Sequence, residues 1–448
     1  MEAHASANEQ LLIDGLSFKL KPGANYVTNR RSVTFHPQGS NIYKTQSGTK
    51  VLKIVLNSND WLDPSTVRLM FDLKNVDADA AKRLRTISGP HSFWRRLRIM
   101  CGGTLIEDFD YNKTHELYCS LKPADEKTND DIEGFLYRAD STGTGTGVHL
   151  QNAYDANTLP GIAGGSYMTV SMKILSGVLN QPKFLPLRHM SGGLSFEFEL
   201  VSDASDPVIV PGVTAAFDAA NTTTSWEIEN CQIKADVLTL DNSLENSYTE
   251  HVMSGKPLPI NYNTFITSNQ TVGGQNMSVA VSRAVTRLKG LFLTFYKPDA
   301  SGIVHKEWNY FYHPMITLTQ SPFFDPGYEL EYQIQLGAKL YPEYPVRSLS
   351  EAFAQLRKTV GLNYGHHAVD ITPMQYRHDK FIVAVDMEKI SEMGFTGENT
   401  MNGQLLVIKV SALNKATLGS DKMPTQMNIY LNSDQIMEIK DVGVTVLD

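Results

Sequence analysis

The side chains with the clearest potential for chemistry are six basic ones in a stretch without acidic residues: Lys82, Arg83, Arg85, Arg95, Arg96 and Arg98. Planar guanidinium groups match the oxygens of phosphates and carboxylates. The stretch could therefore contact a polyanion or the acidic groups of a neighbouring subunit. The alternative is a solvated strand face whose charge is balanced by the acidic residues at 107–110.

The net charge favours a protein contact or a solvated face over a polyanion contact. The chain has 40 Lys and Arg residues against 48 Asp and Glu, a formal charge of -8, whereas binding by phosphate neutralisation calls for a basic surface. On a strand, Arg96 and Arg98 share a face with Trp94, and Arg95 lies on the opposite face. Arg95, Arg96 and Arg98 are thus a candidate contact with a subunit or a polyanion, and we expect no sequence-specific binding of nucleic acid.

The best candidate for a metal site is a histidine-rich segment that contains His366, His367, Asp370, His378 and Asp379. Imidazole and carboxylate groups are zinc ligands. Adjacent histidines on a strand point to opposite faces, so His366 and His367 can reach one ion only across a turn. A solvated loop is the favoured interpretation, and we predict no metal site.

Two groups of carboxylates could in principle form an acid/base pair or a divalent-ion site: Asp108 with Asp110, and Asp130 with Asp131 and Glu133. Neither group has a partner base or nucleophile nearby in the sequence, so acidic turns are the favoured interpretation. The motifs of a phosphate-binding loop and of a nucleophile elbow do not occur, and no periodic helix follows the Gly-Thr repeat at 143–147. We predict no catalytic residues and no cofactor.

Cysteine usage and the N-terminus indicate a protein made inside a cell. Cys101, Cys119 and Cys231 are too few for a disulfide framework. The first ten residues carry Glu2 and Glu9 without an apolar run, unlike a secretory signal. No apolar run approaches the roughly 20 residues of a membrane helix. We expect synthesis in the cell, no secretion and no transmembrane segment.

Short runs of strand length and alternating polarity recur along the first half, at residues 33–35, 51–56, 67–73, 93–100, 168–175, 194–200 and 228–240. In the run 67–73, the apolar side chains of Val67, Leu69 and Phe71 fall on one face. Breakers such as Gly89-Pro90 and Gly102-Gly103 separate the runs. This texture is typical of an all-β sandwich or barrel.

The second half has the same pattern of short, alternating runs, at residues 260–267, 279–285, 288–296, 308–312, 330–340, 381–386, 405–410 and 427–431. A short echo between residues 233–238 and 439–443, offset by 206 residues, suggests a duplication. The polar segment 241–247 is rich in turn formers and marks the boundary between two β domains of similar size.

Few helices are predicted, and the clearest spans 348–360. Ser348 and Glu351 form a capping box, and Gly361 can supply the left-handed position after the last turn. Pro342 and Pro345 are expected to stop the preceding strand. A second short helix is predicted at 113–121, and two long loops at 125–157 and 202–225.

Several sequence blocks carry a family resemblance: SVTFHP at 32–37, WLDPSTVRL at 61–69, GPHSFWRRLRIMCGG at 89–103, YNKTHE at 111–116 and IYLNSDQIMEIKDVG at 429–443. Together they resemble the major capsid proteins of Polinton-like viruses and related small eukaryotic double-stranded DNA viruses. The resemblance implies a double jelly roll, that is, two eight-stranded β-sandwiches with a few short helices in loops. On this basis we expect an N-terminal arm at 1–30, a first jelly roll at 31–241 and a second at 242–448.

The resemblance also implies a function in assembly. Such proteins form trimeric, pseudo-hexagonal capsomers that tile an icosahedral shell, so the expected partners are further copies of the chain, penton proteins and minor capsid proteins, and the expected location is the virion. Loops 125–157 and 202–225 are candidates for the outer or intersubunit surface. The alternatives are a minor capsid or vertex protein, a β-sandwich that binds carbohydrate, and, least favoured, a β-rich hydrolase.

Overall fold

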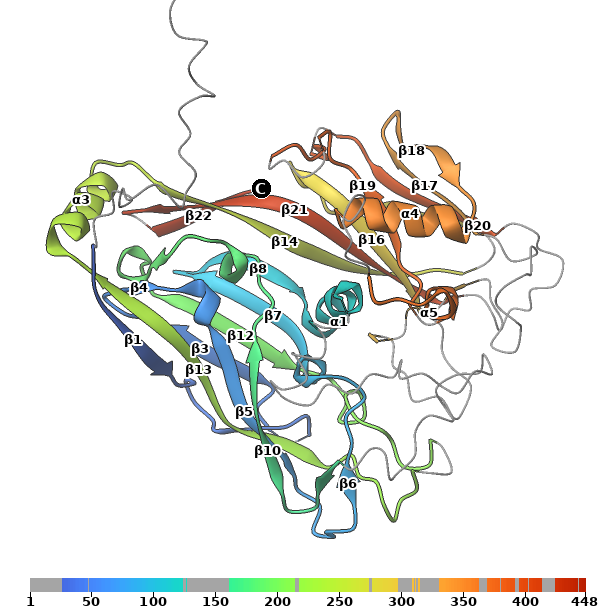
Figure 1. Cartoon of the computed structure of the whole chain (residues 1–448), viewed down its shortest axis with the longest axis horizontal. Coiled ribbons are helices and arrows are strands. Elements are labelled where there is room, and N and C mark those ends of the chain that lie inside the picture. Colours follow the sequence, from blue (N-terminus) through green and yellow to red (C-terminus); the bar gives the residue numbers. More distant parts are fainter. Residues whose placement is uncertain are drawn as a thin grey trace, which may run out of the picture.

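A computed structural model of the chain describes residues 26–46, 48–123, 126, 161–213, 217–273, 276–296, 308–309, 311, 313–314, 330–361, 369–378, 380–390, 395–401, 403–412, 424–441 and 443–448. Two β-sandwiches stand side by side, with the helix α1 between them (Figure 1). Within the described residues, no helix is both long enough and apolar enough to span a bilayer.

The first sandwich is built from eight antiparallel strands: β1 (Val27–Phe35), β3 (Val51–Leu56), β5 (Arg68–Asn75), β7 (Trp94–Cys101), β8 (Thr104–Asp110), β10 (Tyr167–Lys173), β12 (Leu194–Leu200) and β13 (Trp226–Leu240). One sheet has the order β1-β13-β5-β10, and the other has the order β3-β12-β7-β8. Three short strands join the first sheet: β2 (Ile42–Tyr43) and β4 (Trp61–Leu62) pair with β13, and β11 (Leu185–Pro186) pairs with β4. Two more, β6 (Arg83–Leu84) and β9 (Ile162–Ala163), form a separate two-stranded sheet.

The second sandwich contains β14 (Leu258–Thr271), β15 (Asn276–Val281), β16 (Leu288–Tyr296), β17 (Leu330–Leu336), β18 (Lys339–Val346), β19 (Val383–Asp386), β20 (Leu406–Ala412) and β21 (Gln426–Lys440), with β22 (Gly443–Leu447) beside β21. Its sheets have the orders β14-β21-β16-β19 and β15-β20-β17-β18. Counting the eight main strands of each sandwich in chain order, both sandwiches pair strands 1-8-3-6 in one sheet and 2-7-4-5 in the other. The prediction of an all-β, duplicated fold is confirmed.

The offset of the duplication differs from the predicted one. The last main strands, β13 and β21, both have 15 residues and begin at Trp226 and Gln426, so they are 200 residues apart. The echo at an offset of 206 would instead match Ile233, the eighth residue of β13, with Ile439, the fourteenth residue of β21. The echo was therefore a chance match, although the duplication is present.

Two helices follow equivalent strands. α1 (Tyr111–Leu121) follows β8, and α4 (Leu349–Thr359) follows β18, the fifth main strand of each sandwich. The predicted cap of α4 is confirmed: Ser348 Oγ accepts from Glu351 N at 3.1 Å, and Gly361 has a φ of +78°. α4 packs against β19, whereas α1 lies at the junction with the other sandwich.

Two of the helices in the described part of the chain differ from the prediction. α3 (Asn242–Met253) occupies the polar segment that was interpreted as a turn-rich boundary, and α5 (Pro373–His378) precedes β19. The Asp241 carboxylate caps α3 by accepting from Ser243 N at 3.1 Å. Glu245 and Val252 are buried and hold the helix against the molecule. The residue types that cap a helix are also those that form turns, so such a segment predicts a linker and a helix start equally well.

The strand predictions need three corrections. Residues 330–340 are not one strand but the hairpin of β17 and β18, which turns at Gly337 with a φ of +58°. Pro342 and Pro345 do not stop β18, because this edge strand pairs only with β17 among the described strands, where a missing N–H is tolerated. At the predicted strand 308–312, Trp308 and Asn309 form a turn.

The two hydrophobic cores are not divided at the predicted boundary. The core of the first sandwich includes Ile260 and Tyr262 of β14 and Met437 and Ile439 of β21. In Figure 1, β14, β21 and β22 run as a ribbon over the first sandwich, where β14 and β22 lie against β8. The second sandwich therefore completes the core of the first.

Candidate functional site

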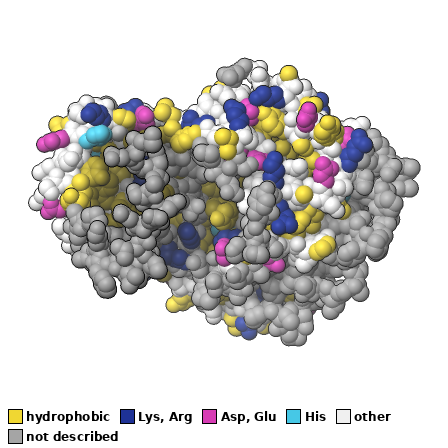
Figure 2. Space-filling model, turned by 45° about the horizontal axis from the view of Figure 1, so that its top comes forward, with side chains coloured by type: hydrophobic (Ala, Val, Ile, Leu, Met, Phe, Trp, Pro, Cys, Tyr) yellow, Lys and Arg dark blue, Asp and Glu magenta, His cyan; other side chains and the backbone are white. Residues whose placement is uncertain are grey.

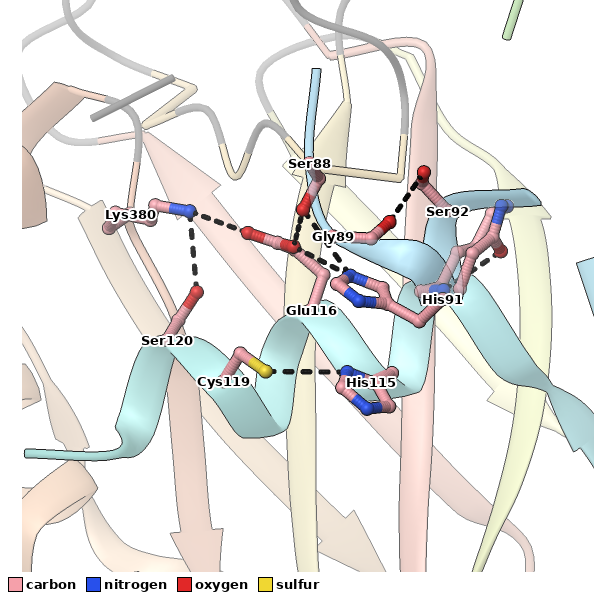
Figure 3. Close-up of polar contacts among 11 residues, drawn as sticks. Ser88, Gly89, His91, Ser92, His115, Glu116, Cys119, Ser120 and Lys380 are labelled. Atoms are coloured by element: carbon pink, nitrogen blue, oxygen red, sulfur yellow. Dashed lines mark hydrogen bonds and ion pairs between the residues drawn. The ribbon is translucent and has the colours of Figure 1, made fainter. Parts of the chain in front are cut away.

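A buried polar cluster joins the two sandwiches (Figure 3). Glu116 of α1 forms an ion pair with Lys380, which precedes β19 in the second sandwich. Lys380 Nζ lies 3.1 Å from Glu116 Oε1. Its other oxygen, Oε2, accepts from Ser88 Oγ at 2.9 Å and lies 3.1 Å from His91 Nε2. Lys380 Nζ also lies 3.3 Å from Ser120 Oγ. Side chains that are 264 residues apart in the sequence thus share one network.

Local sequence chemistry positions these side chains. Pro90 begins a 3₁₀ turn, η3 (Pro90–Phe93), and Ser92 Oγ donates to the carbonyl of Gly89 at 2.7 Å, which fixes His91 beside α1. Glu116 and Ser120 are four residues apart on α1 and share one face of the helix. That face meets Lys380, so a single helix carries both contacts to the second sandwich.

The charge on Glu116 is maintained by its partners. Burial by itself raises the pKa of a carboxyl, but the positive charge of Lys380 and the hydrogen bonds from His91 and Ser88 outweigh that effect and hold the pKa of Glu116 well below its usual range. The cluster therefore contains a buried ion pair with its hydrogen bonds satisfied. Such pairs act more through specificity than through net stability, because desolvation offsets much of the attraction.

Two histidines stack at the edge of this network. The rings of His91 and His115 have centroids 4.1 Å apart and an interplanar angle of 13°. Cys119 Sγ lies 3.3 Å from His115 Nδ1, one helical turn along α1. Burial, followed by the charge of neighbouring His91, lowers the pKa of His115 well below its ordinary value. His115 is thus neutral at pH 7.

The geometry of Ser88, His91 and Glu116 does not match a catalytic triad. In a triad, the imidazole uses one ring nitrogen for the nucleophile and the other for the carboxylate. Here Ser88 Oγ, at 3.4 Å, and Glu116 Oε2 both approach the same nitrogen, Nε2, and Ser88 donates directly to the carboxylate. A neutral His115 likewise does not form the imidazolium–thiolate pair of a reactive cysteine with Cys119. The arrangement connects elements rather than activating a nucleophile.

Two clefts flank β8 where the sandwiches meet. One has a volume of about 410 Å³ and is lined by residues that include His115, and the other has a volume of about 520 Å³. Glu107 lines both, and its carboxylate accepts from Gly177 N at 2.9 Å and from Ser176 Oγ. Burial raises the pKa of Glu107. Gly177 lies so close to β14 that a Cβ atom there would be 1.8 Å from the carbonyl oxygen of Asn263.

The sequence matches no protein-family model and no curated protein. The structure, in contrast, is similar to solved viral capsid chains. A chain of the PBCV-1 virus capsid has a TM-score of 0.62 and 11% identity, covering 96% of this chain and 99% of that chain. The Faustovirus major capsid protein has a TM-score of 0.57 and 9% identity, covering 96% and 94%. The mavirus major capsid protein has a TM-score of 0.50 and 11% identity, covering 100% and 95%.

The chain has the double jelly-roll fold. The strand orders 1-8-3-6 and 2-7-4-5, present twice, are those of two jelly rolls, and the similar chains are matched over nearly their whole length. The buried cluster of Glu116, Lys380 and His91 lies between the two jelly rolls. In a double jelly roll, this junction determines how the two halves sit relative to each other.

The predicted arginine cluster lies on β7 of the first jelly roll. Arg96 forms a bidentate pair with Asp108, with both distances at 2.6 Å, and Arg98 lies 3.2 Å from Glu197. Trp94 does not share their face as predicted: it is fully buried, because an irregularity opposite Glu199 and Leu200 shifts the register of β7. Arg95, predicted to lie on the opposite face from Arg96, is exposed, and it donates to Ser202 Oγ at 2.9 Å.

The six basic residues of the acid-free stretch do not form one surface. Arg85 is buried, donates to the carbonyl of Asn221 at 2.7 Å and lies over the ring of Phe217. Lys82 pairs with Asp77 at 3.5 Å. On the face drawn in Figure 2, basic and acidic side chains are interspersed among the described residues. The stretch is thus distributed over several local contacts.

The other candidate residues divide into two groups. Asp108 and Asp110 lie in or at the end of β8 rather than in a turn; Asp108 pairs with Arg96, and Asp110 accepts from Asn269 Nδ2 at 3.1 Å. His366, His367 and Asp379, the acidic residues at 130–133 and the repeat at 143–147 lie outside the described residues. Where the structure describes the chain, it brings no three His, Cys, Asp or Glu residues into an arrangement that could hold a metal ion.

Proposed function

We propose that the chain is the major capsid protein of an icosahedral double-stranded DNA virus, of the kind found in Polinton-like and related small eukaryotic viruses. The observation that carries the proposal is the end-to-end match of the whole double jelly roll with the chains of viral capsids, in which 96% of this chain and 99% of the PBCV-1 chain correspond. Its activity is assembly rather than catalysis, and its location is the virion.

The capsomer in this proposal is a trimer. Three chains supply six jelly rolls with the same strand orders, which can occupy the corners of a pseudo-hexagonal tile. Tiling requires that the two jelly rolls of one chain hold a fixed relative position. The shared core of β14, β21 and the first jelly roll, together with the buried Glu116–Lys380 pair, supports this requirement.

Contacts with other copies fall on exposed parts of the jelly rolls. Tyr344 of the edge strand β18 is 77% exposed and Tyr167 of the edge strand β10 is 64% exposed, and large aromatic side chains of this kind are enriched in interfaces. Contacts within the trimer are large in this scheme, whereas those between trimers are individually weak and add up over the lattice. Penton and minor capsid proteins complete the set of partners.

The arginine cluster takes a reduced part in these contacts. Arg96 and Arg98 are engaged by acidic residues of the same sheet, which leaves Arg95 as the member that can reach a neighbouring subunit or a polyanion. In the part of the chain that the structure describes, Arg95 forms no ion pair. The proposed contact is therefore centred on Arg95.

Negative-stain electron microscopy of the expressed protein tests the proposed function. We expect pseudo-hexagonal particles of capsomer size or closed shells. A field of single two-lobed chains at micromolar concentration contradicts the proposal. A double substitution of the exposed aromatics, Tyr167→Ser with Tyr344→Ser, should reduce particle formation without unfolding the chain. Tyr118→Ser serves as the matched control because Tyr118, 41% exposed, belongs to the helix α1 and not to an edge strand.

A further inference from the structure

The junction between the jelly rolls contains one balanced ion pair, Glu116 with Lys380, and the two stacked imidazole rings of His91 and His115. At neutral pH, the carboxylate of Glu116 is matched by the ammonium of Lys380, and His115 is neutral. His91 is 1% exposed and contacts both the carboxylate and the ring of His115. Any further positive charge here lies in the same buried space as Lys380.

The groups facing His115 offer little compensation for a proton. Tyr111 and Cys119 belong to its own helix, and Lys122, directly after that helix, lowers the pKa of His115 by its charge. His91 faces it from η3. The cleft that His115 lines is completed by Lys173 of β10 and by Glu107 of β8.

The Glu107 carboxylate, which lines this space, already has partners in Ser176 and Gly177. Glu126 also lines the cleft. Glu116 is the acidic group within the network, and Lys380 already neutralises it. A proton on His115 therefore brings a net positive charge to the junction.

We propose that this junction is an acid-sensitive latch, in which protonation of His115, stacked on His91, releases α1 from Lys380 and loosens the two jelly rolls. The His115 ring lies with its centroid 4.1 Å from that of His91, and the single carboxylate of Glu116 cannot neutralise a charged His115 in addition to Lys380. Water entering the adjacent cleft of about 410 Å³ hydrates the charged ring once the contact opens.

The pH window follows from the directions of the pKa shifts. Because the pKa of His115 is lowered in the folded chain, the unfolded chain binds the proton first, so stability is lost as the pH falls below about 6.5, the ordinary histidine value. The pKa of Glu116 is also lowered, so its contribution is lost only at a lower pH, below the ordinary range of a carboxyl. Glu107 acts in the opposite sense, since its raised pKa means that protonation relieves the cost of its burial.

In a capsid, opening of the latch in acid would loosen the shell, and this consequence alone rests on the proposed function. The latch itself is a property of the single chain. Cys119 provides a reporter, because it is 5% exposed and its sulfur contacts His115, so the thiol is uncovered when the rings separate. Cys101 and Cys231 are buried within the first jelly roll and serve as internal references.

The test is labelling of the full chain with 4,4′-dithiodipyridine, which reacts with thiols in acid, between pH 7.5 and 5.0, with mass spectrometry of each cysteine. We expect the labelling rate of Cys119, divided by that of Cys231, to rise at least about tenfold over this pH range. Tenfold is the change that one coupled proton produces over one pH unit. His115→Gln should abolish the rise. The control His251→Gln, which changes an exposed histidine of α3, should leave the rise unchanged.

A ratio of the Cys119 and Cys231 rates that stays constant with pH in the unaltered chain overturns the latch, whatever the state of assembly. If His115→Gln does not fold, hydrogen exchange of α1 relative to α4 in the unaltered chain replaces it, and equal acceleration of both helices overturns the proposal. A rise at Cys119 in a chain that remains monomeric supports the latch while contradicting the proposed capsid function, so the two failures are distinguishable.

Discussion

Lys380→Met tests whether one buried ion pair holds the two jelly rolls together. Lys380 is 9% exposed and Glu116 7% exposed, so the substitution leaves a buried carboxylate with only the hydrogen bonds of Ser88 and His91. Removing one partner of such a pair typically costs about 3–5 kcal/mol. At about 1.4 kcal/mol for each factor of ten, α1 should open roughly a hundredfold to several thousandfold more often.

Hydrogen-exchange mass spectrometry of α1 at pH 7.5 measures this opening, with α4 as the internal reference. Glu116→Gln combined with Lys380→Met should restore most of the protection, because the neutral amide no longer needs a buried cation. Lys339→Met is the matched control: its pair with Glu398 has a similar distance of 3.0 Å, but the Lys339 side chain is 57% exposed, so a change under about 1 kcal/mol is expected. Less than threefold acceleration of α1 exchange in Lys380→Met refutes the reasoning.

Three further substitutions test separate parts of the structure. Gly177→Ala should destabilise the junction by several kcal/mol in urea unfolding, because the added Cβ would lie 1.8 Å from the Asn263 carbonyl oxygen. Gly273→Ala, where the added Cβ meets open space, should have little effect. Equal effects of the two substitutions contradict the close approach. Ser348→Ala should cost about 1 kcal/mol and speed exchange in α4 alone, and unchanged exchange there means that the cap is unimportant. Arg95→Glu should weaken assembly, whereas Arg96→Ala should change stability by only about 1 kcal/mol because its pair with Asp108 is partly exposed to solvent, with side chains 42% and 24% exposed; normal particles from Arg95→Glu remove Arg95 from the contact surface.

Strand periodicity was the informative signal in the sequence. The predicted bounds 51–56, 194–200 and 288–296 are the observed bounds of β3, β12 and β16, because each of these strands buries alternate apolar residues or lies wholly in the core. β8 was missed because Glu107 and Asp108 interrupt the apolar pattern, although Glu107 is buried against Ser176 and Gly177. A charge inside a core contradicts the pattern from which strands are predicted.

The junction could not be predicted, because its members are far apart in the chain and meet only through tertiary packing. His91 and Glu116 lie in the blocks that carry the family resemblance, but nothing in GPHSF or YNKTHE indicates a partner at Lys380. The spacing of His115 and Cys119 shows that they share a helix face, yet the stacking on His91 depends on the turn η3. The arginine cluster, conversely, stood out in the sequence because its acidic partners come from other strands: Arg96 meets Asp108 of β8.

The solution mass of the purified chain tests the capsid account most directly. Size-exclusion chromatography with multi-angle light scattering at micromolar concentration should give three times the 49.8 kDa of one chain, or larger assemblies built from that unit. A monodisperse species of 49.8 kDa under these conditions contradicts the account, because a double jelly roll that does not associate cannot form a capsomer.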